Sequence, residues 1–186
     1  KKFDLVTSFF SLEHASQPND FLTRVYSILN EDGVFYCIVP DWQKNIADAI
    51  VVDHINHFSK NSISYLLYQN GFKDIKFDFE SHNGSMIFTA KKSMHRKEYL
   101  IDRKEIFDLN LKAIETLDFW SKIKDKIYQF HLKHKGEKSA IYGSGFYGSF
   151  IASCIDDMSD ILYFLDRNQY LVGRDLFEKK IISPED

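Results

Sequence analysis

Apolar and polar positions follow two different periods along the first ninety residues, and this predicts an α/β domain. The apolar run at residues 3–10 predicts a buried strand. Residues 18–29 then carry apolar side chains at the i, i+3, i+4 and i+7 spacing of an amphipathic helix. A turn at residues 30–33 leads to a second apolar run at 34–39, which Pro40 ends. The pattern therefore begins as strand, helix and strand.

The next segment repeats the helical spacing and then changes to alternation. Residues 59–69 predict a second amphipathic helix, with Ser59 or Asn61 as its cap. Apolar and polar residues alternate along residues 72–79, as they do on a half-buried strand. A His-Asn-Gly turn then leads to a second apolar run at residues 86–90. A tight turn between two such runs predicts an antiparallel hairpin that closes the sheet.

The stretch from residue 2 to residue 59 is typical of the second half of a nucleotide-binding α/β domain. It opens on a buried strand that has no preceding strand to pair with. We therefore expect either a fragment or partner strands supplied from elsewhere. The hydrogen-bonding groups on the open edge of that strand favour pairing with a second copy, so a homodimer through this edge is a further expectation.

Beyond residue 92 the composition changes twice. Residues 93–136 combine helical apolar spacing with many charges and contain no Gly or Pro before Gly136, which predicts a helical linker, broken near Trp120. Residues 137–186 then start a second strand–helix–strand unit with one further short strand. The predicted fold class is α/β, in three parts: residues 1–92 as a partial Rossmann-like sheet, the linker, and an incomplete second Rossmann-like unit.

Composition excludes several classes of protein. The net charge of −3 over 186 residues provides no basic footprint for a nucleic acid. Cys37 and Cys154 each lie inside an apolar run, as buried intracellular thiols do. The chain has no run of about 18 apolar residues and no signal-peptide pattern, so we expect no membrane span and a cytoplasmic location.

The strongest sequence motif lies at the start of the second unit. Gly143, Gly145 and Gly148 follow a predicted strand and open a helix, and the next strand ends at Asp166. Glycines in this position let a phosphate approach the free N–H groups at the helix start, and Asp166 is placed to accept a hydrogen bond from a ribose or sugar hydroxyl. A tightly packed helix–strand junction that binds nothing is the alternative.

Histidines follow both predicted strands of the first half. Glu13 and His14 come just after the first strand, where ligands bind in open parallel sheets. Asp53, His54 and His57 lie on the loop before the second helix. A histidine beside an acid is able to act as a general base, with the carboxylate fixing its tautomer. Because no third ligand follows at metal spacing, we expect no metal site.

These residues carry a family resemblance over about residues 2–91. The first half is similar to the fourth and fifth strand regions of class I S-adenosylmethionine-dependent methyltransferases. The resemblance rests, in chain order, on Phe3-Asp4-Leu5-Val6, Leu12-Glu13-His14, Phe21-Leu22, Leu29 to Val34, Val39-Pro40, Asp53-His54, His57-Phe58-Ser59, Ser62-Ile63, Leu66-Leu67 and Gly71-Phe72.

The tail carries a second resemblance. Tyr142 to Gly145, Leu165 to Asn168 and Gly173-Arg174 resemble the C-terminal domain of sugar C-methyltransferases that act on nucleotide-linked deoxysugars. They also resemble nucleotide-sugar-binding domains of surface-polysaccharide enzymes, which end in a similar Ile-Ser-Pro-Glu-Asp. The resemblance therefore implies a methyltransferase whose substrate is a nucleotide-linked sugar in glycan or secondary metabolism.

The resemblance also implies roles for individual residues. S-adenosylmethionine would be the cofactor, and His54 would be the catalytic base, oriented by Asp53. The residues bordering the cofactor would be Phe9, Phe10, Ser11, Glu13 and His14. The residues holding the nucleotide-linked substrate would be Gly143, Ser144, Gly145, Gly148 and Asp166.

The sequence departs from the family pattern at two places, and these affect the expected reaction and the expected cofactor binding. Val51-Val52-Asp53-His54 stands where the sugar C-methyltransferases show Tyr-x-Glu-His, which leaves O-methylation open beside C-methylation. The glycine-rich loop and ribose-binding acid of the cofactor site do not precede residue 1, so we expect this chain to bind S-adenosylmethionine poorly. A non-catalytic nucleotide-sugar-binding module and a fragment of an NAD-dependent oxidoreductase or epimerase are the alternatives.

Overall fold

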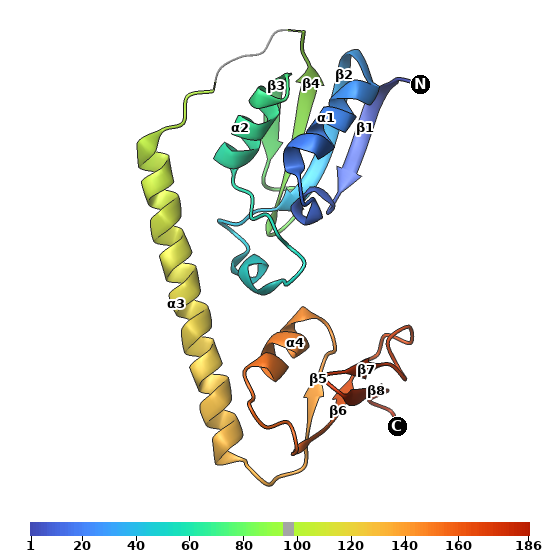
Figure 1. Cartoon of the computed structure of the whole chain (residues 1–186), viewed down its shortest axis with the longest axis vertical. Helices are drawn as coiled ribbons and strands as arrows, with labels where there is room; N and C mark the ends of the chain where they lie inside the picture. Colours follow the sequence, from blue (N-terminus) through green and yellow to red (C-terminus); the bar gives the residue numbers. More distant parts are fainter. Residues whose placement is uncertain (95–98) are drawn as a thin grey trace. The chain divides into compact units, whose positions relative to one another are not determined.

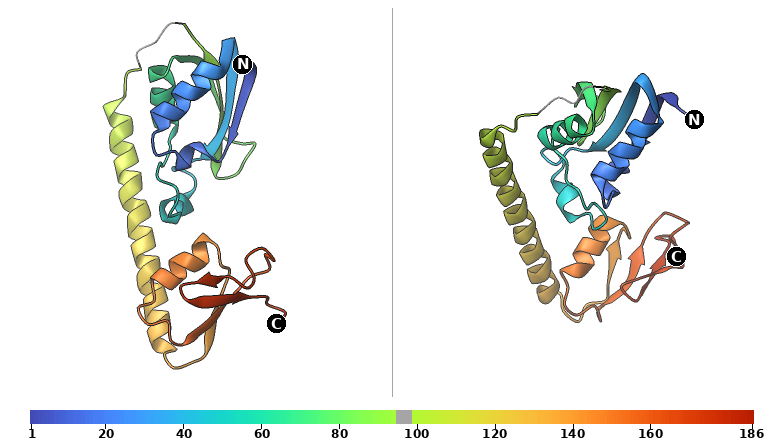
Figure 2. Two further views of the ribbon diagram at one scale, coloured as in Figure 1. Left: turned by 45° about the vertical axis from the view of Figure 1, so that its right-hand side comes forward. Right: turned by 45° about the horizontal axis from the view of Figure 1, so that its top comes forward.

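The computed structural model describes residues 1–94 and 99–186. The chain divides into two compact units, Lys1–Ile114 and Glu115–Asp186, which are drawn in Figure 1 and Figure 2. Part of the expected linker, residues 95–98, lies outside the described residues. No helix among the described residues has both the length and the apolar character needed to cross a membrane.

The first unit is built on one mixed four-stranded sheet. Its strands are β1 (Phe3–Phe9), β2 (Leu29–Pro40), β3 (Phe72–Asp78) and β4 (Ser85–Lys92). Their order in the sheet is β1-β2-β4-β3, with β1 parallel to β2 and the remaining neighbours antiparallel. The predicted α/β class and the closing hairpin of β3 and β4 are confirmed. The expected turn at residues 30–33 lies within β2, where it takes the form of a break in register against β1 between Leu29 and Val34, with Asp32 at a φ of 57°.

Two helices cover one face of this sheet (Figure 1). Helix α1 (Pro18–Ile28) and helix α2 (Lys60–Gln69) contribute apolar side chains to a core that also contains Phe35, Phe72 and Phe88 from the strands. Ser59 caps α2 through a reciprocal pair of hydrogen bonds with Ser62, which confirms one of the two predicted caps. Short 3-10 turns, η1 (Leu12–His14) and η2 (Ile46–Ile50), follow β1 and β2.

Strand β1 forms one edge of the sheet, and its side chains divide between two environments. Val6 and Ser8 point toward the helices, where Val6 packs against the core and Ser8 is buried. Phe3, Leu5 and Phe9, which alternate with them, are about half exposed on the other face. An edge position is the geometry that the expected pairing with a second copy requires.

Helix α3 (Arg103–Lys133) runs without interruption across the boundary between the two units. The expected break near Trp120 is wrong, because no Gly or Pro occurs inside the helix to remove a backbone hydrogen bond. Within the second unit, the ring of Trp120 lies edge-on to Phe150 at 5.0 Å, and this contact packs α3 against helix α4 (Phe146–Ser153).

The second unit contains a smaller sheet in the order β5-β6-β8-β7. Strands β5 (Ser139–Tyr142), β6 (Ile161–Leu165) and β8 (Lys179–Ile182) are parallel, and β7 (Asp175–Leu176) pairs antiparallel with β8. The sequence predicted one further short strand after β6, and the structure has two, joined as a hairpin. The core is small and is centred on the fully buried Phe164.

The junction of β5 and α4 depends on a glycine. A Cβ atom on Gly148 would lie 1.9 Å from the carbonyl oxygen of Gly143, whereas a Cβ on Gly145 would meet no atom within 4 Å. We predict that Gly148→Ala destabilises the second unit by about 1–3 kcal/mol, because the helix must move away from the strand. Gly145→Ala, the matched control, costs less, about 0.5–1 kcal/mol, because alanine is a poorer N-cap than glycine but meets no atom.

Hydrogen exchange followed by mass spectrometry on peptides from residues 139–182 measures this effect directly. Faster exchange in Gly148→Ala than in Gly145→Ala is the expected result. Equal exchange in the two variants would show that the close approach of α4 to β5 is not needed for stability.

Candidate functional site

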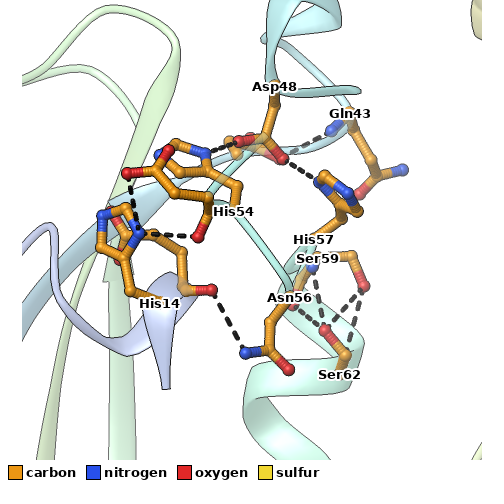
Figure 3. A network of polar contacts seen from close by, with 11 residues as sticks. His14, Gln43, Asp48, His54, Asn56, His57, Ser59 and Ser62 are labelled. Carbon is orange, nitrogen blue, oxygen red and sulfur yellow. Dashed lines mark hydrogen bonds and ion pairs between the residues drawn. The ribbon is translucent and has the colours of Figure 1, made fainter. Parts of the chain in front are cut away.

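The candidate site lies where the parallel strands β1 and β2 end. Their carboxyl ends meet at the same edge of the sheet, which is where ligands bind in open α/β sheets. The chain leaving β1 enters η1, which carries Glu13 and His14. The chain leaving β2 forms a long loop, residues 41–59, that contains η2 and His54. Figure 3 shows the polar contacts between these two loops.

Asp48, on η2, joins two histidines. Its carboxylate oxygens accept hydrogen bonds from Nδ1 of His54 and Nδ1 of His57, each at 2.6 Å. Both bonds are drawn as dashed lines in Figure 3. The Asp48 side chain is 1 % exposed, so both bonds form largely out of water and are strong. Because each Nδ1 carries the donated proton, the neutral rings leave their Nε2 atoms unprotonated.

The expectation that Asp53 orients His54 is corrected by this geometry. The side chain of Asp53 is 76 % exposed, and its carboxylate lies 3.6 Å from Nδ1 of His14. The backbone oxygen of Asp53 accepts a 2.8 Å hydrogen bond from the same nitrogen of His14. Val52 and Asp53 form a turn, closed by the hydrogen bond from the backbone N–H of His54 to the backbone oxygen of Val51. The Asp53 side chain lies toward His14, and Asp48 orients His54.

Glu13 lies in the interior beside these histidines. It is completely buried, and neither carboxylate oxygen has a hydrogen-bond partner on another described residue. Burial raises the pKa of the Glu13 carboxyl, against the smaller opposing effects of its own backbone N–H, His14 and His54. The rings of His14 and His54 meet edge to face at 4.9 Å. The structure thus brings together Glu13, His14 and His54 from two loops.

Asn56 holds the two loops together. Its backbone N–H and its side-chain amide both donate to the backbone oxygen of Glu13, at 3.1 and 3.2 Å, and the amide also donates to the oxygen of Ala15 at 2.7 Å. Sequence analysis missed both Asn56 and Asp48. Neither residue stands in a recognisable motif, and only the fold of the loop shows that they contact the predicted site residues.

The remaining residues expected near the cofactor lie at the end of β1. The Phe9 ring is about half exposed and lies 5.9 Å from the ring of Tyr36. Phe10 adopts a left-handed backbone with φ of 46°, which is strained for a bulky residue. Its N–H still donates to Ile38, and its ring contacts His82 at 5.4 Å. The hydroxyl of Ser11 donates to the backbone oxygen of Phe9.

The residues expected to hold the nucleotide gather at one end of the second sheet. Ser144 donates its backbone N–H and its hydroxyl to Oδ2 of Asp166, at 2.8 and 2.6 Å. The hydroxyl contributes most to lowering the pKa of the Asp166 carboxyl, followed by the backbone N–H groups of Asn168 and Ser144. Gly145 begins α4 with no side-chain cap, and Gly148 packs close to Gly143. Asp166 therefore holds the glycine loop itself.

Comparison with known proteins concerns the first unit. Residues 1–76 match the family model of a methyltransferase domain. This segment is similar to methyltransferases. No curated protein matches the chain. The match covers β1, β2, α1, α2 and both loops that bear Glu13, His14 and His54, and it ends within β3, so the candidate site lies inside the methyltransferase-like segment.

Several solved structures are similar at low sequence identity. A methyltransferase from Archaeoglobus fulgidus has 16 % identity and a TM-score of 0.43, covering 50 % of this chain and 60 % of its own. One from Thermotoga maritima has 15 % identity and a TM-score of 0.43, and the match covers 49 % of this chain and 56 % of that protein. The CurJ carbon methyltransferase has 12 % identity and a TM-score of 0.40, and the match covers 50 % of this chain and 30 % of that protein. This chain spans less than two thirds of each of these proteins.

The double hydrogen bond of Asp48 leads to a stability prediction. In Asp48→Asn the amide oxygen still accepts from one histidine, but the amide N–H₂ faces the Nδ1–H of the other. We predict a loss of about 1–3 kcal/mol in the free energy of unfolding, because a buried hydrogen-bonded group loses its partner. Urea unfolding of the full chain measures the change.

Asp53→Asn is the matched control, since it makes the same chemical change on an exposed side chain six residues from the end of the loop. Its free energy of unfolding is expected to stay within about 0.5 kcal/mol of wild type. If Asp53→Asn destabilised the chain more than Asp48→Asn, Asp48 would not be the residue that holds the histidines.

Proposed function

We propose that this chain is part of an S-adenosylmethionine-dependent methyltransferase that acts on a nucleotide-linked sugar or a related small molecule. The observation that carries the proposal is the His54–Asp48 pair, which lies at the carboxyl ends of β1 and β2 inside the methyltransferase-like segment. A histidine held in one tautomer by a buried carboxylate is suited to accept a proton from an acceptor group.

The family match supports S-adenosylmethionine as the cofactor. When bound, it supplies an electrophilic methyl group on a positively charged sulfur. The end of β1 fits such a group, because the half-exposed rings of Phe9 and Phe10 offer apolar and π-electron surface to a sulfonium. We propose that these rings, with Ser11, Glu13 and His14, form the border of the cofactor site.

His54 is the proposed base. Its Nδ1–H is held by Asp48, so its Nε2 lone pair is available to take a proton from an acceptor hydroxyl, or from a carbon next to a keto group. Loss of this proton would make the acceptor oxygen or carbon nucleophilic toward the methyl group that S-adenosylmethionine would supply. The proton stays on His54, and Asp48 stabilises the resulting imidazolium.

The second unit is proposed to hold the nucleotide part of the substrate. The uncapped start of α4 and the loop from Gly143 to Gly145 favour a diphosphate, since N–H groups at a helix start attract anions. Asp166 fixes Ser144 and retains a second carboxylate oxygen that accepts from Asn168. A ribose or sugar hydroxyl is expected to bind at this carboxylate.

A histidine substitution tests the base. In the full natural protein, His54→Ala is expected to lower the rate of methyl transfer by about 10²–10⁴-fold, the range for loss of a general base, with little change in affinity for S-adenosylhomocysteine. Transfer from radiolabelled cofactor gives the rate, and calorimetry gives the affinity. His131→Ala, in α3, is the control. Unchanged transfer in His54→Ala would remove His54 from the reaction.

A carboxylate substitution tests the substrate site separately. We predict that Asp166→Asn weakens binding of a nucleoside diphosphate sugar to the chain by about tenfold, because one charge-assisted hydrogen bond is lost. Asp175→Asn is the control, an exposed acid paired with Lys180. Calorimetry with the nucleotide sugar and with NAD as separate ligands decides among the alternatives. Binding of NAD alone would favour an oxidoreductase, and nucleotide-sugar binding without S-adenosylhomocysteine binding would favour a non-catalytic module.

A further inference from the structure

We propose that Glu13, His14 and His54 form a binding site for a divalent first-row transition-metal ion. One ligand atom from each residue lies within 4.8 Å of the other two. Two imidazoles and one carboxylate are a donor set that zinc, iron and neighbouring ions accept, with further coordination positions left for water or substrate. Ligands around such an ion lie about 3.4 Å apart, given bond lengths of about 2.1 Å, so the three side chains close slightly on binding.

The carboxylate of Glu13 supplies the first reason to expect a ligand. A completely buried carboxyl group with no partner on another residue is costly, because its charge has lost its hydration without compensation. Buried carboxylates in proteins are usually paired or bound to a metal. The ligand atoms of His14 and His54 lie within 4.8 Å of a Glu13 oxygen, and a cation bound between the three side chains would compensate the buried carboxylate and both imidazole lone pairs at once.

The outer hydrogen bonds of the two histidines supply the second reason. Metal-binding histidines almost always donate their other ring N–H to a carboxylate or a backbone oxygen, which fixes the ring and its tautomer. His54 donates from Nδ1 to the buried carboxylate of Asp48, and His14 donates from Nδ1 to the backbone oxygen of Asp53. Both rings are thus fixed with Nε2 as the available ligand atom (Figure 3).

The sequence argument against a metal considered only the two histidines at 54 and 57. Those two share Asp48 through their Nδ1 atoms and do not converge on one another. The ligands that complete the site come from η1, forty residues earlier in the chain, and the hydrogen bonds of Asn56 bring that turn to the loop. The metal site is therefore a product of the fold and not of local spacing.

The role of the ion, as distinct from its binding, rests on the proposed function. A bound ion occupies Nε2 of His54 and replaces it as the group that activates the acceptor. The acceptor oxygen, a hydroxyl or the oxygen of a keto group, coordinates the ion at an open position and gives up its proton, or that of the adjacent carbon, to solvent. The resulting oxyanion or enolate forms the bond to the methyl carbon, and the carbon–sulfur bond breaks.

Titration of the full, metal-stripped chain with Zn²⁺ tests the binding. Calorimetry is expected to show one ion per chain, and Co²⁺ is expected to give a visible absorption band of nitrogen–oxygen coordination. Glu13→Gln and His14→Ala should each weaken binding by more than the roughly 10–100-fold that loss of an outer hydrogen-bond partner costs. Asp48→Asn should weaken it within that range, and His131→Ala should leave it unchanged.

Two results would overturn the site. One is the absence of stoichiometric Zn²⁺ binding by the wild-type chain. The other is equal binding by wild type and Glu13→Gln, which would mean that the ion sits on surface histidines. Thermal unfolding supplies a check on folding, because Zn²⁺ should raise the melting temperature of wild type but not of His14→Ala, even where both are folded without it.

Activity measurements separate this inference from the proposed function. If the ion binds but the full protein transfers no methyl group, the proposed function fails and the metal site stands. If transfer is lost in His54→Ala but is unaffected by removal of metal and by Glu13→Gln, the ion has no part in the reaction. The proposed function then stands with His54 as the base, the proposed role of the ion fails, and the Zn²⁺ titration alone decides whether the binding site exists.

Discussion

The buried carboxylate of Asp48 is the constraint on which the geometry of the site depends. A carboxylate that is 1 % exposed must be supplied with donors, and both donors come from histidines six and nine residues later in the chain. Satisfying Asp48 therefore bends the loop after β2 into a compact shape. The same two bonds decide which nitrogen of each ring carries the proton, so the fold of the loop and the chemistry of the histidines have one physical cause.

A second set of bonds places this loop against the one after β1. The bonds from Asn56 to the backbone of Glu13 and Ala15 are joined by the bond from His14 to the backbone of Asp53. Each loop thus uses a side chain to satisfy a backbone oxygen of the other, and backbone oxygens in loops need such partners when they are removed from water. This reciprocal arrangement explains how residues forty positions apart form one cluster.

The regular elements were predictable from the sequence because their apolar spacing is long and uninterrupted. Helices α1 and α2 and the hairpin of β3 and β4 follow such patterns. The partner of His54 was not predictable, because loop residues follow no regular period. Asp53 was predicted because it is next to His54 in the sequence, whereas the residue that bonds to His54 is Asp48, in the 3-10 turn η2. Likewise Glu13 could be placed near the sheet edge, but its complete burial depends on the packing of both loops. Only one strand of the pair β7 and β8 was predicted, because the two-residue strand β7 gives no pattern.

The site and the stability of the sheet rest on largely separate interactions. The core is made by the rings of Phe35, Phe72 and Phe88 together with the inner faces of α1 and α2. Asp48, Asn56 and the three histidines lie on loops at the ends of the strands, where they bond mainly to one another and to backbone groups. Leu12 of η1 and Phe58 of the loop after β2 also belong to the core, so changes to the polar contacts act first on the loops and reach the free energy of unfolding through these two side chains. Such a division lets a rigid scaffold keep its shape while its loops carry the chemistry.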